Sequence, residues 1–124
     1  MKNPKAGDPR INENRMKQQT IYVGLNDAES HEQRFDTEKY VSLLKGVCRS
    51  YAVAFSVHRI DGGYFHDDGT YVEEKTLALS MIDVDEGIVR EIAKDLCAFF
   101  RQESVMVTSS PVDVVFVRET VGGV

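Results

Sequence analysis

The feature that most constrains the fold is an Asp68-Gly69 turn between two stretches of strand-forming residues. A tight hairpin turn needs positive backbone φ, which Gly adopts without strain. Tyr64-Phe65 lie before the turn and Tyr71-Val72 lie after it. We therefore expect Gly62–Leu79 to form a β-hairpin that displays aromatic rings beside polar side chains, which is a surface suited to holding a flat polar ligand.

The rest of the chain predicts strand, helix, strand, strand, helix, strand. Apolar residues at three- and four-residue spacing indicate a helix from Asp36 or Thr37 to Ser50, and an Asp83-x-x-Glu86 pattern indicates the start of a second helix. The expected buried stripe of that second helix is Ile88, Ile92, Leu96, Phe99 and Phe100. The expected strands are Thr20–Leu25, Val53–Arg59, the two arms of the hairpin extended to Ile82, and a last strand broken at Ser109-Ser110-Pro111 into Ser104–Val107 and Val112–Val117.

This order predicts an α+β fold: a two-layer ferredoxin-like sandwich, mostly antiparallel, with two helices on one face of the sheet. The other face would be open, with Phe55, Val57, Leu77 and Leu79 as its apolar positions. Such a face is commonly closed by another subunit, so we expect a homo-oligomer, a dimer or a larger assembly such as a hexamer.

The 124 residues suffice for one domain. Residues 1–18 are polar, carry charges of both signs and include two prolines, which predicts a flexible N-terminal arm. We expect residues 19–119 to form a single ligand-binding domain and residues 120–124 a C-terminal tail. Met16, just before the expected first strand, is an alternative start of the natural chain.

The net charge and the hydropathy of the chain limit the classes of partner that we expect it to bind. The formal net charge is −5, with 15 Lys and Arg against 20 Asp and Glu, so a DNA or RNA polymer is not an expected partner. A small anionic ligand needs only two or three local arginines and stays open. No apolar run approaches the roughly 20 residues of a membrane span, and no signal-peptide core is visible, which predicts a cytoplasmic protein that does not bind membranes.

Catalytic and metal-binding patterns are weak. The histidines have no partner at helical spacing, the two cysteines lie far apart on expected helices, and we expect no cofactor. Glu73 and Glu74 would point to opposite faces of a strand and so cannot form an acid–base pair with each other. Either of them could face a pocket as a base, and the alternative is a solvated strand.

A set of binding residues remains. Aromatic rings can stack on a purine, arginines can hold phosphate oxygens, and Asn26 and Asp27 can bind sugar hydroxyls. For each group the alternative is ordinary: packing for the rings, solvation for the arginines, and turn formation for Asn26-Asp27. The aromatic set is Tyr22, Phe65, Tyr71 and Phe116, and the arginine set is Arg34, Arg59 and Arg118.

Three segments together resemble a family of small phage proteins. These segments are Thr20–Asp27, Gly63–Leu77 and Arg101–Val107. The family is that of anti-Thoeris sponges, which sequester the cyclic ADP-ribose signal of bacterial TIR-domain defence. The resemblance spans about Thr20 to Glu119 and implies a non-enzymatic oligomer that acts in the infected host's cytoplasm. It also implies nucleotide pockets at subunit interfaces, and in some members a site for cyclic oligonucleotides of the CBASS system.

The leading hypothesis is therefore a binding protein that traps a small cyclic nucleotide signal without altering it, and not an enzyme. The residues expected to bind the ligand are Asn26, Arg34, Phe65, Tyr71 and Arg118. A second hypothesis is a small ferredoxin-like isomerase or hydrolase that uses Glu73 or Glu74 as its base. A third is a purely structural oligomeric module with a protein partner.

Overall fold

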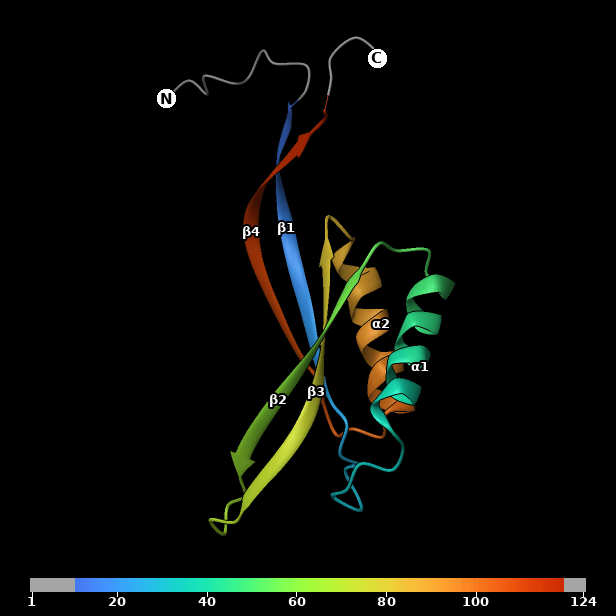
Figure 1. Ribbon diagram of the computed structural model, residues 1–124, viewed down its shortest axis with the longest axis vertical. Helices are drawn as coiled ribbons and strands as arrows, with labels where there is room; N and C mark the ends of the chain where they lie inside the picture. The colour runs from blue at the N-terminus through green and yellow to red at the C-terminus, as the bar shows by residue number, and fades with distance from the viewer. Residues whose placement is uncertain (1–10, 120–124) are drawn as a thin grey trace.

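A computed structural model describes residues 11–119 of the chain, so the expected tail and most of the expected arm lie outside the described residues. The elements follow in the expected order: β1 (Ile11–Gly24), α1 (Thr37–Ser50), β2 (Ser56–Phe65), β3 (Tyr71–Ile82), α2 (Glu86–Phe99) and β4 (Met106–Val117). The sheet order is β2-β3-β1-β4, every neighbouring pair is antiparallel, and both helices cover one face (Figure 1). The prediction of a two-layer α+β sandwich is confirmed.

Strands β1 and β4 are longer and more continuous than expected. β1 begins at Ile11 because its backbone pairs with β4 along most of its length, from Ile11 opposite Val117 to Tyr22 opposite Met106. The expected break at Ser109-Ser110-Pro111 does not occur. Pro111 lies in an edge strand, where the missing N–H can face away from the sheet without loss of a ladder hydrogen bond.

Both helices begin at an acidic cap. Asp36 accepts a hydrogen bond from the Lys39 backbone N–H and begins α1 where the sequence predicted it. The cap of α2 is Asp85 and not Asp83: Asp85 Oδ2 accepts from the N–H groups of Gly87 and Ile88. Asp83 instead adopts positive φ in the turn that leaves β3.

The core lies between the helices and the covered face of the sheet. Leu77 and Leu79 belong to this core and not to the open face. With Met81 they occupy every second position of β3, so all three side chains lie on the face that the helices cover. Phe55 and Val57 also pack partly against it. At the end of α2 the buried aromatic is Phe100, at 2% exposure, whereas Phe99 is 59% exposed. Ile88 is also exposed, and Val89 is buried in its place, so the expected stripe was wrong at Phe99 and at Ile88.

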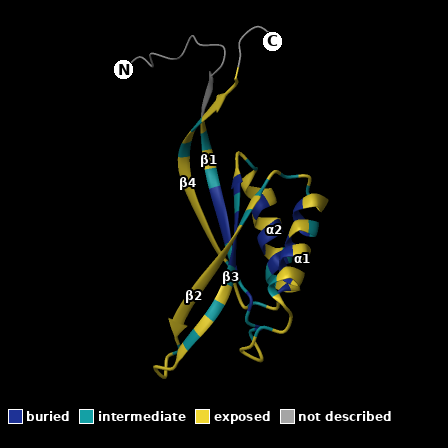
Figure 2. Ribbon diagram, viewed as in Figure 1, coloured by how far each residue is buried: buried dark blue, intermediate teal, exposed yellow. Residues whose placement is uncertain are grey.

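The hairpin turn closes differently from the expected two-residue turn. His66 N–H donates to Thr70 O and Gly69 N–H donates to His66 O, so three residues, Asp67 to Gly69, form the loop. Only Gly69 has positive φ there, as in a type I turn followed by a left-handed residue. The far half of this hairpin extends past the helices, and almost all of β2 is exposed (Figure 2). No helix among residues 11–119 is long and apolar enough to span a membrane.

Candidate functional site

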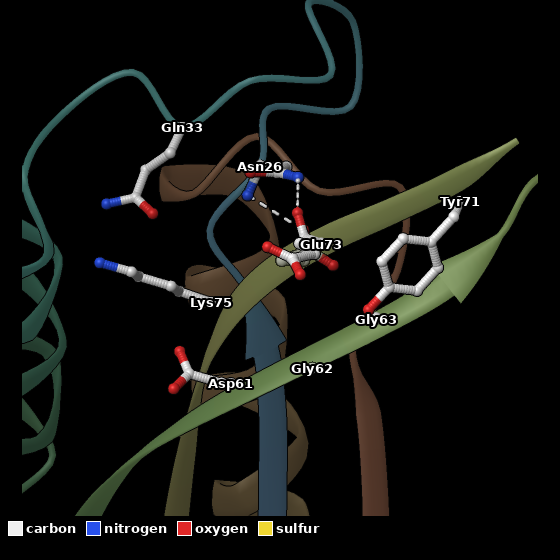
Figure 3. A pocket seen from close by; sticks show the side chains of 9 residues that line it. Asn26, Gln33, Asp61, Gly62, Gly63, Tyr71, Glu73 and Lys75 are labelled. Carbon is white, nitrogen blue, oxygen red and sulfur yellow. Dashed lines mark hydrogen bonds between the residues drawn. The ribbon is translucent and has the colours of Figure 1, made fainter.

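A polar hollow lies where the β2–β3 hairpin passes beyond α1 and meets the loop after β1. It is a cavity of about 680 Å³. Strands β2 and β3 form its floor, and Asn26 and Gln33 reach it from the loop (Figure 3). Its lining is Asn26, Gln33, Asp61, Gly62, Gly63, Tyr71, Glu73, Glu74 and Lys75.

Glu74 has the most firmly positioned carboxylate of this cavity. Its Oε2 accepts a hydrogen bond from the Asn26 backbone N–H at 3.0 Å. Its carboxylate also lies against the Cα of Gly24, where a Cβ would collide with it. A strand glycine often marks a close approach of this kind. The Glu74 side chain is thus half-buried, and its hydrogen bond to Asn26 uses Oε2.

Asn26 joins three parts of the chain. Besides the bond to Glu74, its Nδ2 donates to the Glu73 carbonyl at 3.2 Å, and its own carbonyl accepts from Gln102 Nε2 at 2.5 Å. These bonds hold the end of β1 against β3 and against the segment that follows α2. Asn26 therefore organises the cavity wall.

A second cavity of about 340 Å³ adjoins the first and shares Asn26 and Glu74 with it. Tyr64 and His66 bring the hairpin to this cavity, and His31 brings the loop. The His66 ring lies edge-on to both His31, at 5.6 Å between centroids, and Tyr64, at 5.4 Å. These contacts hold the hairpin against the loop.

The charge around both cavities is negative. The first cavity has three carboxylates, Asp61, Glu73 and Glu74, against one ammonium, Lys75, which gives −3 + 1 = −2 in formal charge. The second adds Asp27 and Glu103. An anionic phosphate would be repelled here, whereas a cation would be attracted.

Asp27 belongs to a separate ion-pair cluster. Its Oδ1 accepts from the backbone N–H groups of Ser30 and Glu29, and its Oδ2 lies 2.6 Å from Arg101 Nε in an ion pair without hydrogen-bond alignment. The Ser30 N–H first, and then the Glu29 N–H with Arg101 and Arg34, hold the pKa of Asp27 below its usual value against the opposing effect of burial. This cluster fixes the loop that carries Gln33.

The expected ligand-binding residues are only partly brought together. Asn26 and Tyr71 line the first cavity, and the Tyr71 ring covers Gly63 and contacts Phe65, with 5.3 Å between ring centroids. Arg34 lies apart from them: its Nη1 is 3.8 Å from Asp27 Oδ2 and its guanidinium lies over Phe35.

Arg118 lies at the opposite end of the molecule. It follows the end of β4, which pairs with the start of β1, while Asn26 follows the end of β1. At about 3.3 Å per residue, Arg118 and Asn26 are roughly 40–50 Å apart in one chain. One chain therefore does not combine these two residues in one pocket.

Sequence reasoning missed Gln33, Asp61, Lys75 and Gln102 as site residues. The alternation of β3 already places Lys75 on the same face as Glu73 and Tyr71. That signal was available, but the approach of Gln33 and Gln102 depends on tertiary structure alone.

Other chemistry finds little support in this part of the chain. Residues 11–119 contain no group of three His, Cys, Asp or Glu side chains placed to hold a metal ion. Burial raises the pKa of the Cys48 thiol to about 11, which disfavours the reactive thiolate. Carboxylates and polar groups are thus the chemistry that the cavities offer.

Comparison with known proteins gives a result at the level of the fold. No protein-family model and no curated protein sequence matches the chain. Among solved structures, a phage SAM lyase in complex with S-methyl-5′-thioadenosine aligns with a TM-score of 0.61 and 20% identity, over 86% of this chain and 93% of that one. The same kind of enzyme without ligand, a phage SAM lyase in the apo state, aligns with a TM-score of 0.61 and 21% identity, over 86% and 92%.

These matches correct the leading hypothesis. The expectation of a non-enzymatic sponge for cyclic ADP-ribose is contradicted, because the matched structures are of an enzyme. They are phage proteins, as the resemblance implied, but they are lyases and not sponges of Thoeris or CBASS signals. The alternative hypothesis of a small enzyme agrees better with these matches.

Proposed function

We propose that this protein is an enzyme that cleaves S-adenosylmethionine and releases S-methyl-5′-thioadenosine. The carrying observation is the Glu74 carboxylate, held by the Asn26 N–H between two acidic cavities. The shared fold with a phage SAM lyase that was captured with this thioadenosine supports the choice of substrate.

The charge of the cavities fits the substrate better than the product. S-adenosylmethionine carries a sulfonium and an ammonium, both positive, and one carboxylate, whereas S-methyl-5′-thioadenosine is a neutral thioether. Carboxylates near the sulfonium therefore favour substrate over product, which promotes product release. The acceleration itself must come from interactions that strengthen in the transition state.

Cleavage breaks the bond between the sulfonium sulfur and Cγ of the amino-acid part, and the electron pair stays on sulfur. Without water, two routes complete the reaction. The substrate carboxylate can attack Cγ and close a lactone, or a base can remove a Cβ proton to leave an alkene. The second route needs a protein base, and Glu74 is the carboxylate fixed in place for it.

The test is product analysis by chromatography and mass spectrometry after the purified protein is incubated with S-adenosylmethionine. We expect S-methyl-5′-thioadenosine well above a control without protein. The second product identifies the route: homoserine lactone for ring closure, vinylglycine for proton removal and homoserine for hydrolysis. Absence of thioadenosine above the control would contradict the proposed function.

A matched pair of variants tests the role of Glu74. Glu74→Gln keeps the shape of the side chain and removes its charge, and we expect kcat/KM to fall by about 100-fold, within the usual range for a general base. Glu91→Gln makes the same change on the exposed surface of α2, where Glu91 forms an ion pair with Lys94, and should leave kcat/KM unchanged.

The biological setting is part of the proposal. S-adenosylmethionine is made inside cells, so we propose that the protein acts in the cytoplasm of a bacterium, as a phage product that depletes this metabolite. We also propose that it works as a homo-oligomer, since the sheet face away from the helices leaves large apolar side chains exposed, including Met106 at 58% and Phe116 at 55%.

A further inference from the structure

We propose that Asp61, Lys75 and Gln33 form a subsite for an α-amino-acid zwitterion, which would bind the amino-acid end of the substrate. Lys75 receives the carboxylate, and Asp61 with the Gln33 side-chain oxygen receives the ammonium. The assignment to S-adenosylmethionine rests on the proposed function. The subsite itself rests on the geometry below.

Asp61 and Lys75 lie directly opposite each other in the pairing of β2 with β3, and both line the first cavity. Opposite charges in such a cross-strand position usually attract and pair. Within residues 11–119, however, neither side chain forms an ion pair or a side-chain hydrogen bond with another residue. Both charges are therefore available to a ligand that carries both signs.

The neighbouring position on β2 shows why Asp61 lies open. Arg59, two residues earlier on the same face, reaches Glu38 of α1 at 2.5 Å. Asp61 is the next residue on that face, beyond the point where α1 supplies a partner, and it points into the cavity beside Lys75 (Figure 3). The N-terminal end of α1 thus separates Arg59, which has an ion-pair partner on the helix, from Asp61, which has none there.

Gln33 has a fixed amide orientation. Its Nε2 donates to the Phe35 carbonyl at 2.8 Å and to Thr37 Oγ1 at 3.2 Å. Both donors of the amide are thus directed toward the start of α1. The side-chain oxygen is left for the cavity, on the side of the amide away from α1 (Figure 3). An oxygen presented in this way accepts a hydrogen bond from an ammonium but not from a carboxylate.

The order of groups along the hairpin matches the order of groups in the proposed substrate. The Asp61–Lys75 pair comes first, the Gly63–Glu73 pair follows, and the Phe65–Tyr71 pair ends the ladder, all on one face. A zwitterion, a sulfonium and a nucleoside would meet two opposite charges, the Glu73 carboxylate and two aromatic rings in that sequence. Glu74, the next residue of β3, reaches the same cavity from the side of Asn26. Four residues of strand span about 13 Å, which allows these groups to be contacted in turn.

Calorimetry with two adenosyl compounds tests the subsite without turnover. S-adenosylhomocysteine carries the zwitterion but no sulfonium, and S-methyl-5′-thioadenosine lacks both. We expect the wild type to bind S-adenosylhomocysteine about tenfold or more tightly than the thioadenosine, as charge-assisted hydrogen bonds allow. Lys75→Met and Asp61→Asn should each reduce this ratio toward one while the thioadenosine affinity stays unchanged.

Lys94→Met, on the exposed surface of α2, is the matched control and should keep the ratio of the wild type. The proposal is overturned if the wild type binds both compounds equally, or if Lys75→Met weakens both to the same extent. If neither compound binds, the proposed function fails on its own, and free amino acids then decide the subsite. In that case L-methionine, but not 3-(methylthio)propylamine, should shift the Gln33 side-chain amide signals in NMR spectra, and no shift would overturn the subsite as well.

Discussion

At the scale of single residues, the adjacent aromatics Phe99 and Phe100 differ in burial, and only Phe100 belongs to the core. Phe99 and Phe100 end the same helix, but about 100° of helical rotation separates them. Phe100 packs against Tyr40, with 5.0 Å between ring centroids, and Phe99 faces outward near the surface of α1. The sequence offers apolar residues on both sides of this stripe, so only the packing of α2 on α1 determines which one is buried.

We expect Phe100→Ala to lower the free energy of unfolding by about 3–5 kcal/mol, because it leaves a cavity in the core. Phe99→Ala should change it by no more than about 0.5 kcal/mol, as usual for an exposed position. Urea unfolding followed by circular dichroism measures both values. Equal losses would mean that the face of α2 is rotated from the one described.

Asp27 ties stability to pH. Its folded pKa lies below its value in the unfolded chain, so its contribution is present above the unfolded pKa and is lost as pH falls through the folded pKa. We expect the melting temperature to fall on acidification below about pH 4, and to fall less in Asp27→Asn. Thermal melts at pH 7 and pH 3 test this. An identical acid dependence in the variant would show that other carboxylates carry the effect.

At the scale of elements, the sequence predicts what local chemistry controls. The Asp36 cap, the apolar spacing of α1 and the Asp68-Gly69 turn each specify their element within a few residues. The meeting of Asn26 with Glu74 is different, because 48 residues separate them and only the pairing of β1 with β3 joins them. The candidate site depends on such long-range contacts, and so the residues chosen from sequence were only partly correct.

The contact between β1 and β3 gives a test that separates function from stability. In Gly24→Ala the new methyl group meets the Glu74 carboxylate, which is the flexible end of a side chain and can move aside. We expect little change in melting temperature but a fall in kcat/KM of about tenfold or more, since a misplaced catalytic group is costly. Gly46→Ala, where a methyl group meets nothing, is the control and should keep full activity.

At the scale of the whole molecule, the two faces of the sheet differ in their cover. The helices bury one face, while the other carries exposed apolar side chains from its outer strands, among them Ile60, Met106 and Phe116. A surface of this kind on a small protein commonly marks an interface. The sequence predicted the open face correctly but assigned β3 residues of the core to it.

We expect light scattering to show at least a dimer at micromolar concentration. Phe116→Lys, on the open face, should shift the protein toward monomer by placing a charge in the interface. Leu43→Lys, at a similarly exposed apolar position on α1, should not. A wild-type monomer, or dissociation by both variants alike, would contradict an interface on the open face.

The part of the hairpin that extends beyond the helices should open locally at a lower free energy than the rest of the sheet. In this part, backbone hydrogen bonds join only β2 and β3, and both faces of the two-stranded ribbon are exposed to water. The middle of β1, in contrast, pairs with two strands and is covered by the helices (Figure 2). Local opening needs the least free energy where buried apolar contacts are fewest. Amides of Asp61–Val72 should therefore exchange hydrogen faster than those of Thr20–Val23, and substrate that bridges the two strands should slow them. Warming would then release the proposed substrate through fraying of this ribbon while the helices and the inner strands are still folded.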